Sequence, residues 1–203
     1  MGDYLDPYTR HEGVTHEDAY NNFLEVLEFA RNNRERVILL RGNHDEFLSD
    51  ENRECCRHDY HNIERNSKLF KDNEDLFQFA YREGDYLFTH AGVCTGWLLQ
   101  NNLTHINEDN IVDYLNSNPK TLWQIGESRN GLNDWGSPLW CCWLYDWQND
   151  DCKNPFKLKQ VFSHVRLEKG MYASNEEKNI YMMDVRNCFL LKDDEFILLS
   201  PEN

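Results

Sequence analysis

The chain has 203 residues, of which 40% are hydrophobic and 13% aromatic, and this composition is typical of a folded globular protein rather than a disordered one. The length predicts a single domain, residues 1–203, with a sizeable core. The formal net charge is −15, from 21 basic and 36 acidic residues, which argues against nucleic acid or an anionic membrane as the main partner. An anionic substrate would therefore need local positive charge, from metal ions or a few arginines.

Targeting signals and cysteines indicate the compartment. No apolar run approaches the length of a transmembrane helix, and the first residues lack the pattern of a signal peptide. The seven cysteines include two adjacent pairs but no CxxC pair. An odd number without a disulfide framework is typical of reduced thiols, so we expect a cytoplasmic protein.

The chain begins with two carboxylates, Asp3 and Asp6, placed between Gly2 and Pro7. This pattern is typical of a turn or a strand end. Taken alone, it fits an Asx-type turn at a frayed terminus better than a functional site.

A helix is predicted next. Residues 15–18 have the pattern of a capping box, and apolar residues then recur at helical spacing through about Asn32. We expect this helix to connect two neighbouring parallel strands, one ending at Asp3 and one at Arg41, as in an α/β sheet. Both strand ends would then lie at the same edge of the sheet.

Residues 37–40 (Val-Ile-Leu-Leu) predict a buried strand that Gly42 ends. Asn43, His44 and Asp45 follow at once, and polar groups at the end of a buried strand are typical of a functional site. The alternative is an ordinary strand-to-helix turn with Asn43 as the N-cap.

Two later apolar strands also end in a histidine. Residues 86–89 precede His90, and residues 160–162 precede Ser163 and His164. A histidine at a strand end can be a metal ligand, although more often it is a structural residue. Three closing strands are predicted at residues 180–184, 188–191 and 195–199.

The remaining segments carry weaker signals. Residues 51–62 contain thiols and imidazoles, but their spacing lacks the form of a zinc motif, and a solvated helix or loop explains them better. Two short helices are predicted within residues 67–82, and a helix at about residues 108–115. The tryptophan-rich residues 126–156 are either a surface excursion packed by its own aromatic side chains or a loop on the substrate side.

Four motifs together resemble those of the calcineurin-like metallophosphoesterases. Residues 39–45 (Leu-Leu-Arg-Gly-Asn-His-Asp) resemble the GNH(D/E) signature, and the preceding Leu-Leu-Arg is most similar to the phosphoprotein-phosphatase branch. Residues 2–6 resemble GDxxD, residues 88–92 resemble FxHxG, and residues 161–164 resemble VxGH with Ser163 in place of glycine. Residues 137–140 (Ser-Pro-Leu-Trp) are similar to a stretch of bacterial and phage relatives. The motifs occur in the order of the family and extend over nearly the whole chain.

The resemblance implies an α/β fold in which a β-sandwich of mixed sheets is flanked by helices. It also implies a dinuclear centre of Mn, Fe or Zn. By position in the motifs, Asp3 would be the bridging carboxylate, and Asn43, His90 and His164 would complete one metal site. Oxygen and imidazole donors suit these ions.

The implied reaction is hydrolysis of a phosphate ester. In the family, a metal-bound hydroxide attacks phosphorus in line with the leaving oxygen. His44 would be the general acid that protonates the leaving oxygen, and Asp6 would orient it. The implied substrate is a phosphoprotein, a dinucleoside polyphosphate or a small phosphomonoester.

Two departures from the family pattern stand out. Pro7 occupies the position of a phosphate-binding arginine, which Arg10 or Arg41 would have to replace. The family's D-x-H motif would precede Asp3, where only two residues stand, so we expect a chain truncated at its N-terminus relative to the family. The alternative function is therefore a catalytically impaired fragment, or a pseudo-phosphatase that binds a metal or a partner in the same crevice.

Overall fold

The computed structural model describes residues 1–9, 13–49, 59–167, 171–185 and 187–199. Its α-helices are α2 (His16–Asn32), α3 (Asn43–Ser49), α4 (Ile63–Lys71), α5 (Thr95–Gln100) and α6 (Ile111–Ser117). Its 3-10 helices are η1 (Glu74–Leu76), η2 (Pro119–Trp123) and η3 (Glu127–Arg129). Its strands are β1 (Leu39–Leu40), β2 (Phe77–Gln78), β3 (Ala80–Glu83), β4 (Tyr86–Thr89), β5 (Lys159–Phe162), β6 (Ala173–Asn175), β7 (Ile180–Met182), β8 (Cys188–Lys192) and β9 (Glu195–Leu199).

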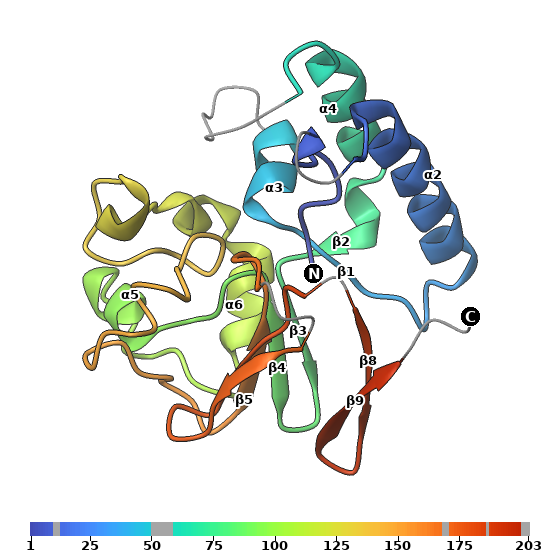
Figure 1. Ribbon diagram of the computed structural model, residues 1–203. Coiled ribbons are helices and arrows are strands. Elements are labelled where there is room, and N and C mark those ends of the chain that lie inside the picture. Colours follow the sequence, from blue (N-terminus) through green and yellow to red (C-terminus); the bar gives the residue numbers. More distant parts are fainter. Residues whose placement is uncertain (10–12, 50–58, 168–170, 186, 200–203) are drawn as a thin grey trace.

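A mixed five-stranded sheet forms the centre of the molecule, with strand order β3-β4-β5-β7-β6 (Figure 1). Strands β4, β5 and β7 run parallel, while β3 and β6 pair antiparallel at the two edges. Because β4 and β5 are parallel neighbours, their carboxyl ends meet at one edge of the sheet. Strand β4 precedes His90, and strand β5 precedes His164.

The two faces of this sheet are both covered. On one face Leu87, Phe162 and Met182 pack into the main core with α5 and α6. On the other face the hairpin of β8 and β9 covers the strands, and the ring of Phe196 meets Tyr86 at 5.7 Å and Tyr181 at 5.1 Å. Side chains alternate between the faces because successive strand residues point in opposite directions. The predicted α/β architecture with mixed sheets and flanking helices is confirmed.

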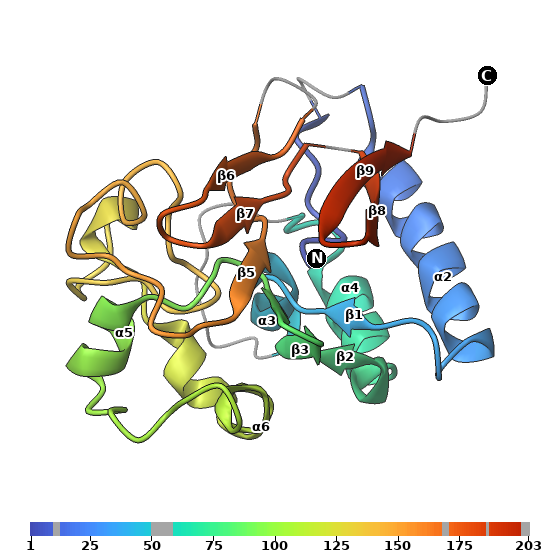
Figure 2. The same ribbon diagram turned by 90° about the horizontal axis from the view of Figure 1, so that it is seen from below.

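A second, smaller core lies around the short parallel pair β1 and β2. Helices α2 and α4 lie on the opposite side of the molecule from α5 and α6 (Figure 2). Phe23 of α2 and Phe70 of α4 are fully buried, with ring centroids 5.0 Å apart. The predicted capping box is present, since the Thr15 and Asp18 side chains each accept from the other residue's backbone.

Two predictions about strands and helices are wrong. Residues 77–78 and 80–83 form strands β2 and β3, where a helix was predicted. Their apolar residues fit either period, and the parallel partner β1 decides in favour of a strand. The expected strand ending at Asp3 is absent from the described residues, and β1 pairs with β2 instead.

The tryptophan-rich residues 126–156 form no strand of the sheet and no helix beyond η3. Trp140, Trp143 and Trp147 are buried in the main core, so these side chains pack the segment onto the sheet. The expected helix near residues 108–115 is α6, and all three closing strands are present as β7, β8 and β9.

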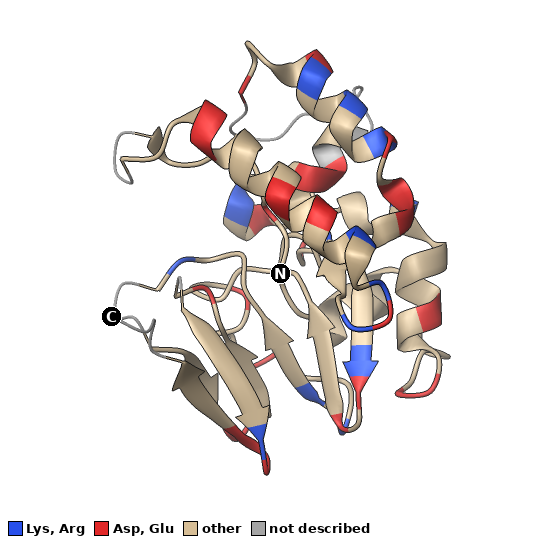
Figure 3. Cartoon of the chain, turned by 90° about the vertical axis from the view of Figure 1, so that its right-hand side faces the viewer, with Lys and Arg blue, Asp and Glu red and all other residues tan. Residues whose placement is uncertain are grey.

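Charged residues are concentrated on the helices and at the hairpin turns, while the strands carry few (Figure 3). Within the described part of the chain, no helix combines the length and apolar character needed to cross a membrane.

Candidate active site

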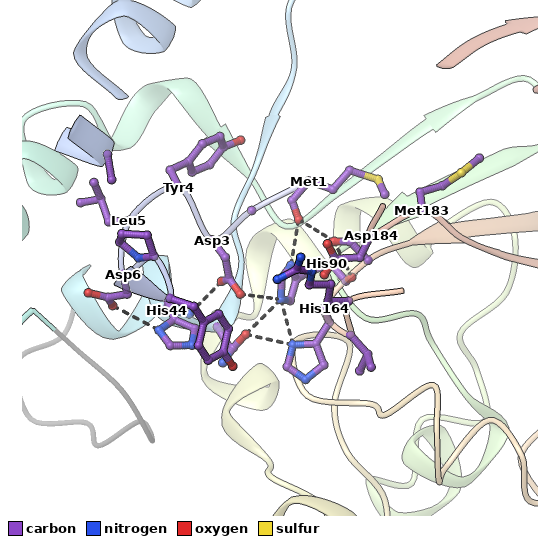
Figure 4. A pocket seen from close by; sticks show the side chains of 18 of the residues that line it. Met1, Asp3, Tyr4, Leu5, Asp6, His44, His90, His164, Met183 and Asp184 are labelled. Atoms are coloured by element: carbon purple, nitrogen blue, oxygen red, sulfur yellow. Dashed lines mark hydrogen bonds and ion pairs between the residues drawn. The ribbon is translucent and has the colours of Figure 1, made fainter. Parts of the chain in front are cut away.

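Four segments from both cores bring polar side chains to one cavity of about 1160 Å³. Asn43 and His44 begin α3 directly after β1 and Gly42. His90 follows β4, and His164 follows β5 by two residues. Asp3 and Asp6 come from the irregular N-terminal segment, and Figure 4 shows Asp3, His90 and His164 directed toward one point.

Four potential metal-ligand atoms converge at that point. The Nε2 atom of His90 lies 3.0 Å from Oδ1 of Asn43, 3.1 Å from Nδ1 of His164 and 3.5 Å from Oδ2 of Asp3. The Nδ1 atom of His164 also lies 3.1 Å from Oδ1 of Asn43. The ligand atoms of Asp3, His90 and His164 all lie within 4.8 Å of one another, a spacing that a metal ion could occupy.

The hydrogen bonds of these groups direct acceptor atoms toward one another, an arrangement that favours a cation bound between them. Nδ1 of His90 lies 2.8 Å from the carbonyl oxygen of Met1, so it carries the proton and leaves Nε2 as a bare lone pair. That lone pair faces the Asn43 and Asp3 oxygens, which are acceptors too. Burial lowers the pKa of His90, and burial followed by repulsion from His90 lowers the pKa of His164 well below 6.5. Neutral imidazoles beside a carboxylate fit a divalent ion of the Mn, Fe or Zn type.

An unusual backbone conformation determines where several of these side chains point. The φ angles are 60° at Asp3, 60° at Asp6 and 75° at His164, in the left-handed region that residues with a Cβ rarely adopt. Gly2 and Gly42 pack directly against each other, and a Cβ on Gly42 would lie 2.1 Å from Oδ1 of Asp3. Strained positions of this kind cluster at functional sites.

Asp45 ties the N-terminal segment to the turn after β1. Its carboxylate accepts from the backbone N–H groups of Asp3 at 2.6 Å, Tyr4 at 3.0 Å and Gly42 at 2.8 Å. Burial and repulsion from Asp3 raise the pKa of Asp45 to about 7, against the effect of these donors. A cation bound at Asp3 would relieve that repulsion.

His44 and Asp6 form a second buried pair beside the ligand atoms. Nδ1 of His44 lies 3.1 Å from Oδ2 of Asp6, and the other Asp6 oxygen accepts from the Asp59 backbone N–H at 2.7 Å. The His44 backbone N–H donates to Oδ1 of Asp3 at 3.1 Å. Because Asp6 is held on both oxygens, it can fix the orientation of the His44 ring.

The structure thus brings together all six residues that the sequence singled out, but it does not support Arg41 as a phosphate-binding residue. The Arg41 side chain is 6% exposed, donates to Glu46 at 2.8 Å and has its Cζ 5.7 Å from the ring centre of Phe77 and 5.4 Å from that of Phe79. Arg10 lies outside the described residues.

Arg129, which the sequence reasoning did not single out, lines the cavity instead, as does Arg166, two residues after His164. Nε of the half-buried Arg129 has no hydrogen-bond partner among the described residues. Trp140 of the tryptophan-rich segment also reaches the site, where its ring meets that of His164 edge-on at 5.9 Å. No sequence pattern marks these contacts, because they join distant segments.

The alternative metal site in residues 51–62 falls largely on Cys55, Cys56 and His58, which lie outside the described residues. Asp59 is described, and its carboxylate accepts from Asn62 at 2.7 Å.

The chain matches the family model described as calcineurin-like phosphoesterase over residues 1–181. This match covers most of the sequence, so the chain belongs to the calcineurin-like phosphoesterases. Membership supports metal-dependent hydrolysis of phosphoesters as its general class of reaction. Comparison with curated proteins and with solved structures gives no match.

Proposed function

We propose that this chain hydrolyses phosphate esters with a divalent metal ion held by Asp3, Asn43, His90 and His164. The observation that carries the proposal is the convergence of lone pairs on these residues beside the His44–Asp6 pair. When bound, the ion would neutralise phosphate charge and lower the pKa of a nearby water. Manganese is the ion we expect to support activity.

His44 is the proposed general acid. It lines the cavity, its Nδ1 lies 3.1 Å from Asp6, and Nε2 is the ring nitrogen proposed to donate a proton to the leaving oxygen. The Asp6 carboxylate stabilises the protonated imidazole and fixes the ring orientation. This proton transfer matters most when the leaving group is unstable as an anion.

Arg129 is the proposed phosphate-binding side chain. It lines the cavity, its Nε has no partner among the described residues, and its charge acts on His164. A guanidinium beside the ligand cluster supplies the local positive charge that a chain of net charge −15 needs for an anionic substrate. The substrate classes we propose are a phosphoprotein, a dinucleoside polyphosphate or a small phosphomonoester, with neither nucleic acid nor membrane as a partner.

A second candidate function is a pseudo-phosphatase that binds one ion without turnover. Among the described residues, the metal-ligating groups at this cavity form one cluster, Asp3, His90 and His164. If catalysis requires two ions, this cluster alone would be insufficient.

Steady-state hydrolysis of p-nitrophenyl phosphate and phenyl phosphate with Mn²⁺ tests the proposal. The His44→Asn variant should lose about 10²–10⁴-fold in kcat on phenyl phosphate, and less on p-nitrophenyl phosphate, because only the poorer leaving group depends strongly on the acid. The exposed residue His105 provides the control His105→Asn, which should retain full activity.

Metal content measured on the same samples separates the candidates. Bound Mn²⁺ with turnover that depends on His44 supports the hydrolase. Bound Mn²⁺ without turnover supports the pseudo-phosphatase, and absence of Mn²⁺ binding contradicts both.

A further inference from the structure

A second group of metal-ligating side chains lies outside the cavity. The Sγ atoms of Cys94, Cys141 and Cys152 all lie within 4.8 Å of one another. These three residues are 0%, 1% and 0% exposed, and none of them forms a disulfide. None of them lines the candidate active site, so this cluster is separate from the one described above.

Three thiols grouped in the interior satisfy one another poorly, because the S–H group is a weak donor and sulfur a weak acceptor. The Cys94 sulfur accepts from the Trp97 backbone N–H at 3.4 Å. As neutral thiols these groups offer one another only weak hydrogen bonds, whereas one metal ion could bind all three sulfurs at once.

The groups around the cluster are those expected beside a bound cation. The Asp146 carboxylate accepts from the Cys142 backbone N–H at 2.8 Å and is hydrogen-bonded to the Cys141 thiol. Lys178 donates to the carbonyl oxygens of Trp147 at 2.8 Å and Asn149 at 2.7 Å, and its charge acts on Cys152. A carboxylate and a lysine thus lie near the sulfurs: the negative charge of Asp146 favours a cation, and Lys178 offsets the excess charge of three thiolates.

We propose that Cys94, Cys141 and Cys152 bind a zinc ion as three thiolates. Zinc prefers thiolate ligands at about 2.3 Å in tetrahedral geometry, which puts the sulfurs about 3.8 Å apart, inside the observed spacing. On binding, the three thiols release their protons to solvent and each sulfur forms one bond to zinc, with no change of oxidation state. A disulfide would join only two sulfurs and would leave the third without a role.

The position of the cluster suggests what the zinc ion does. Cys94 lies four residues after His90, whereas Cys141 and Cys152 belong to the irregular segment between η3 and β5. That segment touches the active site, since Pro138 accepts from the Ala91 backbone N–H at 2.7 Å. Zinc would fasten this irregular stretch to the segment that follows β4.

Absorption spectroscopy with Co²⁺ in place of zinc tests the proposal, because thiolate ligands give an intense sulfur-to-cobalt charge-transfer band that oxygen and nitrogen ligands do not. The freshly reduced full chain should show this band on titration with up to two equivalents of Co²⁺, one for each proposed site, and zinc should abolish it. Cys141→Ala should weaken the band at least tenfold. The matched control is Cys142→Ala, since Cys142 is the adjacent residue, is equally buried and does not belong to the cluster.

Three results would overturn the proposal. The first is the absence of the charge-transfer band in the reduced wild-type chain, a result that does not depend on whether any variant folds. The second is an unchanged band in Cys141→Ala. The third is a disulfide between two of the three cysteines, found by mass spectrometry of the protein isolated without reductant.

Discussion

At the residue scale, the site depends on side chains held in conformations that the chain would not adopt by itself. His164 has a φ of 75°, which costs on the order of 1 kcal/mol for a residue with a Cβ. In that conformation, the Nδ1 atom of His164 lies beside Oδ1 of Asn43 and Nε2 of His90. The packing of both cores must therefore stabilise an arrangement that is locally unfavourable.

Replacing Asp6 with asparagine should lower kcat by about 10–100-fold. The amide keeps the shape of the side chain but loses the charge that favours the protonated His44 imidazole. The loss should be greater for phenyl phosphate than for p-nitrophenyl phosphate, with bound Mn²⁺ unchanged. The exposed Asp75 offers the control Asp75→Asn, and equal kcat values in the two variants would contradict the role of Asp6.

The metal-free protein should lose stability as the pH falls below about 6.5, the ordinary pKa of histidine. Burial lowers the pKa values of His90 and His164, so the unfolded chain binds protons that the folded chain does not. Each histidine should lower the free energy of unfolding by up to about 1.4 kcal/mol per pH unit as the pH falls, while Asp45, whose pKa is raised to about 7, contributes a slope of opposite sign between its ordinary pKa and pH 7.

Urea unfolding in the presence of a chelator measures this slope. His164→Asn should make it shallower, and His105→Asn, at an exposed position, should leave it unchanged. A slope that is unchanged or steeper in His164→Asn would show that the folded chain does not hold His164 neutral.

At the scale of elements, the turn between β1 and α3 determines where Asp3 lies. Gly42 leaves room for the Asp3 side chain, and Asp45 holds the backbone of the N-terminal segment through three hydrogen bonds. The segment of residues 1–9 has no strand of its own, so these contacts replace the pairing that a strand would provide.

Gly42→Ala should weaken Mn²⁺ binding at least tenfold. The added Cβ would lie 2.1 Å from Oδ1 of Asp3 and 2.6 Å from its backbone nitrogen, so Asp3 must move. Gly84→Ala is the matched control, because a Cβ there meets nothing within 4 Å, although its φ of +56° adds strain. Isothermal titration calorimetry measures both affinities, and equal affinities would mean that Asp3 is not a ligand.

At the scale of the whole molecule, the site lies where the two cores meet. Asn43 and His44 follow β1 of the smaller core, whereas His90 and His164 follow strands of the main sheet. A metal ion bound by both groups would link the cores and stabilise the folded chain as a unit.

Mn²⁺ should therefore raise the free energy of unfolding by about 2.7 kcal/mol at a concentration one hundred times the dissociation constant. His164→Ala should remove most of this gain, and His105→Ala should retain it. Chemical denaturation with and without Mn²⁺ provides the measurement. A gain that persists in His164→Ala would place the ion elsewhere in the molecule.

Much of the site could be predicted from the sequence, because its residues stand at the ends of predicted strands. Asn43, His44, His90 and His164 each follow an apolar run, and a strand end is rigid enough to position a functional group. Residues 77–83 could not be assigned in the same way, because their apolar spacing fits a helix and a strand alike.

By itself, then, the sequence determined the family motifs, the mixed α/β class and the six candidate residues, since these depend on local patterns and on order along the chain. Only the tertiary structure decided that Arg41 is buried beside Glu46, that Arg129 lines the cavity and that three distant cysteines meet. Such contacts join residues from far apart in the chain. Local propensity carries no information about them, because packing of the two cores determines which surfaces meet.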